Sequence, residues 1–244
     1  MRLDRFLIKT ANGPRKVARR LIFSGRVTVN GEVVTSPAHH IDPSKDVVEV
    51  DGKRITYIEN VYLILYKPVG YVTSTSDPEH PTVMDLVEGL PFVGPIFPAG
   101  RLDLDAEGLV FLTSDGQLAH RLMHPRYHVP RTYEVRVERP IEPEKIEALE
   151  EGRVVLADGY HPLPVSVEIV EPTFIRITVF EGKYHLVKRL IAASGSKVLN
   201  LKRIAIGPIK LGNLLPGEWR MLSDDEVAEL RRAIERSKGT ERRP

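Results

Sequence analysis

The sequence of 244 residues contains no cysteine. Disulfide bonds, thiolate metal sites and cysteine nucleophiles are therefore excluded. No apolar run approaches the roughly 20 residues that a membrane-spanning helix needs, and the N-terminal MRLDRFLIKT lacks the hydrophobic segment of a signal peptide. The eight histidines show neither an HExxH motif nor another paired metal-ligand spacing. These absences predict a cytoplasmic protein with no metal, no cofactor and no membrane contact.

Charge is distributed unevenly along the chain. Residues 1–58 contain 11 Lys or Arg against 6 Asp or Glu, a net charge of +5, whereas the rest of the chain carries −3. Within residues 1–26 the basic residues number 8 and the acidic residues 1. Neutralised phosphates release counterions, so a concentrated basic segment favours a nucleic-acid partner. The alternative is a solvated basic helix face.

The basic segment has the pattern of a small folded unit. Two short helices are expected, one with Leu3, Phe6 and Leu7 on its apolar face and one that begins at Pro14 and stops at Gly25, with an apolar stripe of Val17, Leu21 and Ile22. Asn30-Gly31 and Asp51-Gly52, each between alternating strands, predict tight hairpins with type I′ turns.

The segments RLDRFL, ARRLI and GRVTVNGEVV resemble the S4 RNA-binding domain over residues 1–58. The resemblance implies that the second helix and the hairpin lie against structured RNA. The basic residues expected to contact RNA are Arg2, Arg5, Arg15, Lys16, Arg19 and Arg20.

A second body is expected over residues 59–236, followed by a flexible tail at 237–244. Strands are predicted over 61–66, 108–114, 131–137 and 174–182, and helices over 117–124 and 184–194. Ser223 and Glu226 form a capping box that opens a final amphipathic helix. Hairpin-length links between mixed elements predict an α+β fold with a mixed, mostly antiparallel sheet.

The stretch GRLDLDAEGL at residues 100–109 alternates polar and apolar residues. In a strand, Leu102 and Leu104 would point into a core, and Arg101 and Asp103 would pair on the opposite face together with Asp105. Taken alone, the pattern fits an ion pair at a sheet edge as well as a functional site.

Four segments in order resemble the motifs of RsuA-type pseudouridine synthases: YKPVGYVTSTSDPEHPTV, AGRLDLDAEGLVFLTSDG, HPRYHVPRTYEV and EGKYHLVKRLIAASG. The resemblance implies that Asp103 is the catalytic carboxylate, that Tyr133 stacks on the target base and that Lys188 is the cation beside Asp103. It places Arg101 on the RNA-facing side, with Lys67 and Arg189 as further RNA contacts. The sequence departs from the family pattern at Tyr66, Ala106, Arg131 and Leu186.

The implied reaction suits these residue types. Pseudouridine forms when the bond from uracil N1 to ribose C1′ breaks, the base rotates and C5 bonds to C1′. One ionised carboxylate suffices, either to attack C1′ or to take a sugar proton. A glycosidase would need two catalytic carboxylates, and Asp105 could imitate the second. Because the detached base must be retained, we interpret Asp105 as structural or RNA-facing.

The sequence therefore predicts a monomeric rRNA pseudouridine synthase with an N-terminal S4 domain, acting on 16S rRNA. The alternatives are an RluB-type enzyme acting on 23S rRNA and, in a different class, a non-catalytic rRNA-binding or assembly factor. Four histidines are expected to be structural or RNA-contacting: His120, His124, His128 and His185. Three further basic residues either extend the RNA-binding surface or lie on a solvated strand face: Lys202, Arg203 and Lys210.

Overall fold

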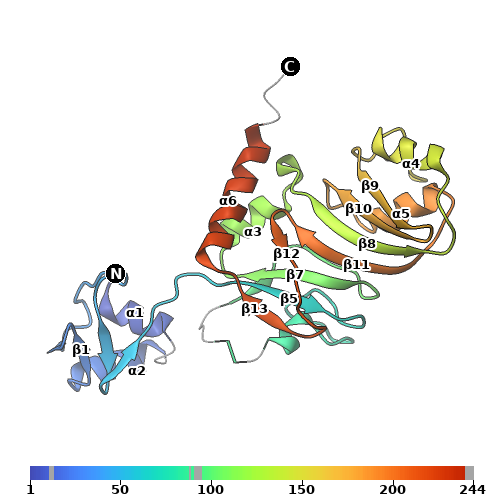
Figure 1. The fold of residues 1–244 in the computed structure, drawn as a ribbon. Coiled ribbons are helices and arrows are strands. Elements are labelled where there is room, and N and C mark those ends of the chain that lie inside the picture. The colour runs from blue at the N-terminus through green and yellow to red at the C-terminus, as the bar shows by residue number, and fades with distance from the viewer. Residues whose placement is uncertain (11–13, 88, 91–94, 240–244) are drawn as a thin grey trace. The chain divides into compact units, whose positions relative to one another are not determined.

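The computed structural model describes residues 1–244 except 11–13, 88, 91–94 and 240–244. The chain divides into two compact units, one built mainly from Met1–Val61 and the other mainly from the residues that follow. The division falls close to the boundary expected between residues 58 and 59. Figure 1 traces both units along the chain.

The first unit has the expected two helices and two hairpins. Its elements are α1 (Leu3–Lys9), α2 (Arg15–Phe23), β1 (Val27–Val29), β2 (Glu32–Val33), β3 (Val48–Val50) and β4 (Lys53–Ile55). The strands form an antiparallel sheet in the order β2-β1-β3-β4. Both hairpin turns are confirmed, since Asn30, Gly31, Asp51 and Gly52 all have positive φ, as type I′ turns require.

The first unit also has its own apolar core. Leu3, Phe6 and Leu7 of α1 are buried against Ile22 of α2 and the inward residues of β1 and β3. On α2, Ala18 is buried, whereas Val17 and Leu21 of the expected stripe are only half-buried. A single α2 face is therefore inward, and its basic residues are left on the opposite side.

The second unit is built on a mixed sheet with helices around it. Its strands are β5 (Tyr62–Lys67), β6 (Phe97–Pro98), β7 (Glu107–Thr113), β8 (Arg131–Val137), β9 (Ser166–Glu171), β10 (Phe174–Val179), β11 (Val198–Ile206), β12 (Ile209–Lys210) and β13 (Trp219–Met221). The main path runs β13-β5-β7-β11-β8-β10-β9, in which β7 and β11 are parallel and the other pairs antiparallel. The predicted mixed, mostly antiparallel sheet is confirmed.

Helices complete the second unit. They are η1 (Val83–Leu86), α3 (Gly116–Met123), η2 (Pro125–Tyr127), α4 (Pro143–Glu150), α5 (Leu186–Ala193) and α6 (Asp224–Gly239). Figure 1 shows α3 and α6 side by side, and α4 near β9 at the far end of the sheet. Leu118 and Leu122 of α3 and Leu230 and Ile234 of α6 share one core with Phe111 of β7. The two helices therefore pack on the sheet through an apolar core that includes β7.

The C-terminal helix begins where the capping box predicts. Ser223 N–H donates to the Glu226 carboxylate at 2.9 Å, and Glu226 N–H donates to Ser223 Oγ at 3.2 Å. The helix continues through Gly239, so it includes residues 237–239, which were expected to start the flexible tail. Residues 240–244 of that tail lie outside the described residues.

Candidate active site

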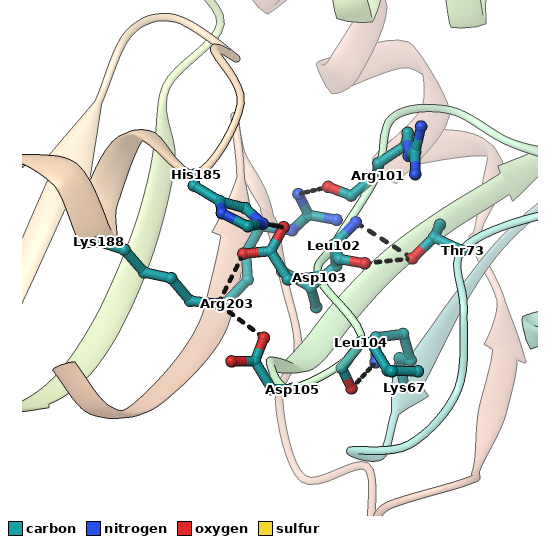
Figure 2. A network of polar contacts seen from close by, with 10 residues as sticks. All are labelled: Lys67, Thr73, Arg101, Leu102, Asp103, Leu104, Asp105, His185, Lys188 and Arg203. Atoms are coloured by element: carbon teal, nitrogen blue, oxygen red, sulfur yellow. Dashed lines mark hydrogen bonds and ion pairs between the residues drawn. The ribbon is translucent and has the colours of Figure 1, made fainter. Parts of the chain in front are cut away.

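A cleft of about 690 Å³ lies in the second unit, at the end of the parallel β7–β11 pair. Most of its lining comes from the loop before β7, strand β8, strand β11 and the segment from the end of β10 into α5, and the loop after β5 and the end of α3 contribute further residues. Asp103 and Tyr133 line the cleft, and Lys188 reaches Asp103 from α5. Figure 2 shows how Asp103, Asp105 and Lys188 converge. Segments that are far apart in sequence thus meet at one carboxylate.

The segment carrying Asp103 is a loop, so the expected strand over 100–109 is wrong up to residue 106. Phe97–Pro98 pairs antiparallel with Leu112–Thr113, and the chain between them must therefore reverse direction. Asp103 C=O accepts from Ala106 N–H at 3.1 Å, which closes the turn. Leu102 is buried as expected, but Leu104 is 38% exposed.

Thr73 fixes this loop from the side. Its hydroxyl donates to Leu102 C=O at 2.8 Å and accepts from Leu102 N–H at 3.1 Å. Both residues are buried, so each of these backbone groups is satisfied away from water. The residue next to Leu102 is Asp103, whose position is thereby set by two hydrogen bonds (Figure 2).

Lys188 bridges the two carboxylates of the loop. Its Nζ lies 3.0 Å from Asp103 Oδ2 and donates to Asp105 Oδ1 at 2.6 Å. Asp103 keeps 24% of its side chain exposed and Asp105 keeps 71%. Partial burial alone would lower the pKa of Lys188, but its hydrogen bonds to Asp105 and Asp103 outweigh burial and raise it. The same ammonium lowers the pKa of Asp105. Lys188 is therefore a permanent cation beside Asp103.

The second basic group at Asp103 is His185, and not Arg101 as the sequence suggested. His185 Nε2 lies 3.4 Å from Asp103 Oδ1. Arg101 is exposed and its guanidinium points away from Asp103 (Figure 2). The expected Arg101–Asp103 pair is wrong because the loop turns between these residues rather than extending as a strand. Arg101 still lines the cleft, with its side chain free to contact a ligand.

Two buried cations lie beneath the loop. Arg203 is 2% exposed, and its Nε donates to Leu109 C=O at 2.7 Å and its Nη1 to Arg101 C=O at 3.2 Å. Lys67 is fully buried, and its Nζ donates to the carbonyls of Pro68, Tyr71 and Leu104 at 2.9, 2.8 and 3.4 Å. Burial lowers the pKa of Lys67 to about 8.

These positions correct two expectations. Lys67 was expected to contact RNA, but a fully buried ammonium that links the turn after β5 to the Asp103 loop supports the loop instead. Arg203 belongs neither to a solvated strand face nor to an RNA-binding surface, for the same reason. Lys202 is half-buried over the Tyr66 ring at 4.9 Å, and Lys210 is exposed on β12.

Tyr133 lies on β8 and lines the cleft with 8% of its surface exposed. Its register partners are Ile177 on β10 and Arg203 on β11, so it is central in the sheet. Arg131, two residues earlier, donates to the carbonyls of Val129 and Leu122. Burial lowers the pKa of Arg131, and its guanidinium lies 3.5 Å from the position that a Cβ on Gly182 would occupy.

Arg189, the last expected RNA contact of the second unit, is engaged elsewhere. Its Nη2 lies 2.5 Å from Asp158 Oδ1 with 29% of its side chain exposed. Arg189 is thus paired with the loop after α4, and it is not among the residues that line the cleft.

Thr73 was not singled out from the sequence, and neither His185 nor Arg203 was assigned a contact with the Asp103 loop. His185 is the one of these with a local signal, because it directly precedes the helix that carries Lys188. The burial of Arg203 depends on carbonyls distant in the chain, which no local pattern shows. The other three of these histidines lie apart from the cleft: His120 on α3 is a ring neighbour of His124, which caps that helix, and His128 follows η2.

A separate basic surface lies on α2 of the first unit. Arg15, Lys16, Arg19 and Arg20 line a shallow groove together with Phe23, whose ring is 65% exposed. Arg5 is exposed, whereas Arg2 and Arg19 both approach the buried Asp4, at 2.9 and 3.6 Å. Arg15, Lys16 and Arg20 are the basic residues of this surface most open to an anionic partner.

In the part of the chain that the structure describes, no helix is long and apolar enough to cross a membrane. Within the same residues, no group of three or more His, Asp or Glu side chains is arranged to hold a metal ion.

The sequence matches the family model described as RNA pseudouridylate synthase over residues 61–193. The chain belongs to the RNA pseudouridylate synthase family. Residues 1–48 match the S4 domain. The chain is accordingly a pseudouridine synthase, an isomerase that acts on RNA, with an S4 domain at its N-terminus, and the resemblance seen in the motifs is confirmed.

Full-length relatives agree with this assignment. The chain is 43% identical to an uncharacterized RNA pseudouridine synthase of Aquifex aeolicus, covering 96% of this chain and 95% of the relative. It is 40% identical to ribosomal small subunit pseudouridine synthase A of Escherichia coli, covering 94% and 100%. A crystal structure of a pseudouridylate synthase superposes with a TM-score of 0.65 at 36% identity, covering 94% of this chain and 99% of that one.

Proposed function

We propose that this pseudouridine synthase modifies a uridine of 16S rRNA, with Asp103 as its catalytic carboxylate. The observation that carries the proposal is the Asp103 carboxylate held 3.0 Å from Lys188 in a cleft that also contains Tyr133. The relative named ribosomal small subunit pseudouridine synthase A matches over its whole length, which supports the small-subunit rRNA as substrate.

The target uridine must leave its RNA stack before it can reach Asp103, at a cost of a few kcal/mol. A cleft of about 690 Å³ has room for one nucleoside, and the Tyr133 ring supplies a surface on which uracil can stack. Arg101, exposed at the cleft edge, is placed to enter the space that the flipped nucleotide vacates. These contacts offset the cost of flipping.

Asp103 then acts on the sugar. The N1–C1′ bond breaks with its electron pair on N1, the uracil rotates, and C5 bonds to C1′ while the C5 proton is lost and N1 is protonated. Attack on C1′ and removal of a sugar proton both require the ionised carboxylate. Lys188 supplies a fixed positive charge for that form, in a site where preorganised charges act more strongly than in water.

The S4 domain anchors the rRNA through the open basic residues of α2. Each phosphate that such a residue neutralises contributes about −0.7 to −0.9 to the slope of log affinity against log salt. Arg20→Gln should therefore flatten the salt dependence of rRNA binding, whereas Lys45→Gln, an exposed lysine outside α2, should not. Equal slopes for Arg20→Gln and the wild type would remove α2 from the RNA interface.

Tritium release tests the substrate. Transcribed 16S and 23S rRNA carry tritium at uracil C5, and closure of the C5–C1′ bond expels it. We expect stoichiometric release from 16S rRNA and none from 23S rRNA. Release from 23S rRNA alone would assign the RluB-type function. Tight binding to rRNA without release from either would leave the chain a binding or assembly factor.

A further inference from the structure

The turn between β10 and α5 carries an exposed aromatic pair at the mouth of the cleft. The rings of Tyr184 and His185 are stacked, with centroids 3.7 Å apart and planes inclined by 19°. Tyr184 is 76% exposed although one face of its ring is covered by His185. The other face is therefore open to solvent. A single exposed aromatic residue is ordinary, but this one is stacked on a side chain that contacts the catalytic carboxylate.

The backbone fixes the direction of the pair. His185 has φ 48° and ψ 31°, the left-handed region, directly before α5 begins. Non-glycine residues rarely adopt this region, and strained residues of this kind cluster at functional sites. The conformation brings His185 Nε2 to 3.4 Å from Asp103 Oδ1. The ring pair is thus a continuous surface leading from Asp103 out to solvent.

Charge at the same edge suits a nucleic-acid strand. Lys183 is exposed next to Tyr184, and its Nζ lies 4.6 Å from the Tyr160 ring centroid. Arg101 and Lys183 both line the same cleft, and Lys188 contacts Asp103 there. An open aromatic face flanked by cations offers both stacking and phosphate contacts, which together are how proteins hold single-stranded nucleic acids.

We propose that the open face of Tyr184 stacks an unpaired RNA base adjacent to the target uridine. The uridine itself enters beside Tyr133, so the enzyme has two stacking positions on consecutive nucleotides. His185 backs the Tyr184 ring and aligns it with the cleft. This proposal rests on the proposed function, and it identifies Tyr184 as a residue that selects unpaired RNA around the target.

The test separates affinity from chemistry. Tyr184→Ala, Tyr184→Phe and the control Leu215→Ala, another residue with 63% exposure but outside the cleft lining, are assayed for tritium release from transcribed 16S rRNA. We expect Tyr184→Ala to raise KM by about tenfold, the size of one lost base stack, with a much smaller effect on kcat. Tyr184→Phe and Leu215→Ala should resemble the wild type.

A modified RNA identifies the stacked base. Once the target uridine is mapped, hairpins are made with an abasic nucleotide on its 5′ or its 3′ side. One of the two abasic hairpins should bind the wild-type protein about tenfold more weakly than the intact hairpin does. Tyr184→Ala should bind that abasic hairpin and the intact hairpin with equal affinity. An unchanged KM in Tyr184→Ala, a loss confined to kcat, or equal losses on both abasic hairpins would overturn the proposal. Failure of the wild type to release tritium would instead contradict the proposed function.

Discussion

Replacing Gly108 by alanine should destabilise the second unit strongly. Gly108 lies in the parallel contact between β7 and β11, opposite Arg203. It has φ +106°, and a Cβ there would lie 2.3 Å from Arg203 O and 2.7 Å from Arg203 N. The neighbours are backbone atoms in a central strand, so they cannot swing aside.

The magnitude follows from two costs. An alanine forced into this conformation costs about 1–3 kcal/mol, and the added carbon must push two strands apart, which costs about 1–3 kcal/mol more. The sum, roughly 2–6 kcal/mol, is a large share of the 5–15 kcal/mol that typically stabilises a domain. Gly217→Ala is the matched control, because Gly217 has φ +87° and nothing within 4 Å of the added Cβ.

Urea unfolding followed by tryptophan fluorescence provides the assay. Trp219, the single tryptophan of the chain, lies on β13 and reports on the second unit alone. Gly108→Ala should lower the free energy of unfolding by about 1–3 kcal/mol more than Gly217→Ala does. If the two variants have the same free energy of unfolding, the close approach of β7 to the Arg203 backbone does not exclude a side chain at residue 108.

Three further perturbations test the site and the C-terminal helix. Lys188→Met should lower kcat by about 30-fold, since losing one partner of a partly buried ion pair costs about 2 kcal/mol. Lys188→Arg should recover part of the lost kcat, and an unchanged kcat in Lys188→Met would contradict the role of this cation. Tyr133→Phe should keep rRNA affinity and Tyr133→Ala should lose about 1–3 kcal/mol of it, measured by filter binding; an unaffected Ala variant would make Tyr133 a packing residue. The hydrogen bond from Arg220 lowers the pKa of Glu226 from 4.5 to about 2, so this carboxylate stabilises the fold above pH 4.5 and the contribution is lost as pH falls toward 2. The difference in melting temperature between Glu226→Gln and the wild type should accordingly be larger at pH 7 than at pH 3, and a constant difference would refute the pairing.

Local patterns predicted much of the fold. The Asn30-Gly31 hairpin, the strand that became β8 and the capping box of α6 depend on neighbouring residues alone, and the structure contains all three. The alternation of residues 100–106 imitated a strand because period-two spacing does not reveal whether a partner strand is present. The chain reverses there to pair β6 with β7.

The site was predictable only through its motifs. The resemblance to known synthases singled out Asp103 and Lys188, which the structure brings to 3.0 Å. The burial of Lys67 could not be foreseen, because its carbonyl partners come both from the turn after β5 and from the distant Asp103 loop. The contact of His185 with Asp103 was not foreseen, because it depends on a left-handed backbone conformation that few non-glycine residues adopt.

Asp103→Asn tests the central claim most directly. The substitution is nearly isosteric and removes only the negative charge, so fold and rRNA affinity should be kept while neither route at C1′ remains available. Asp105→Asn is the matched control, and it should retain measurable turnover because Lys188 keeps its contact with Asp103. Tritium release from 16S rRNA at saturating RNA is the measurement. We expect no detectable release by Asp103→Asn with binding intact; normal release by that variant, or loss of release in Asp105→Asn alone, would contradict the assignment.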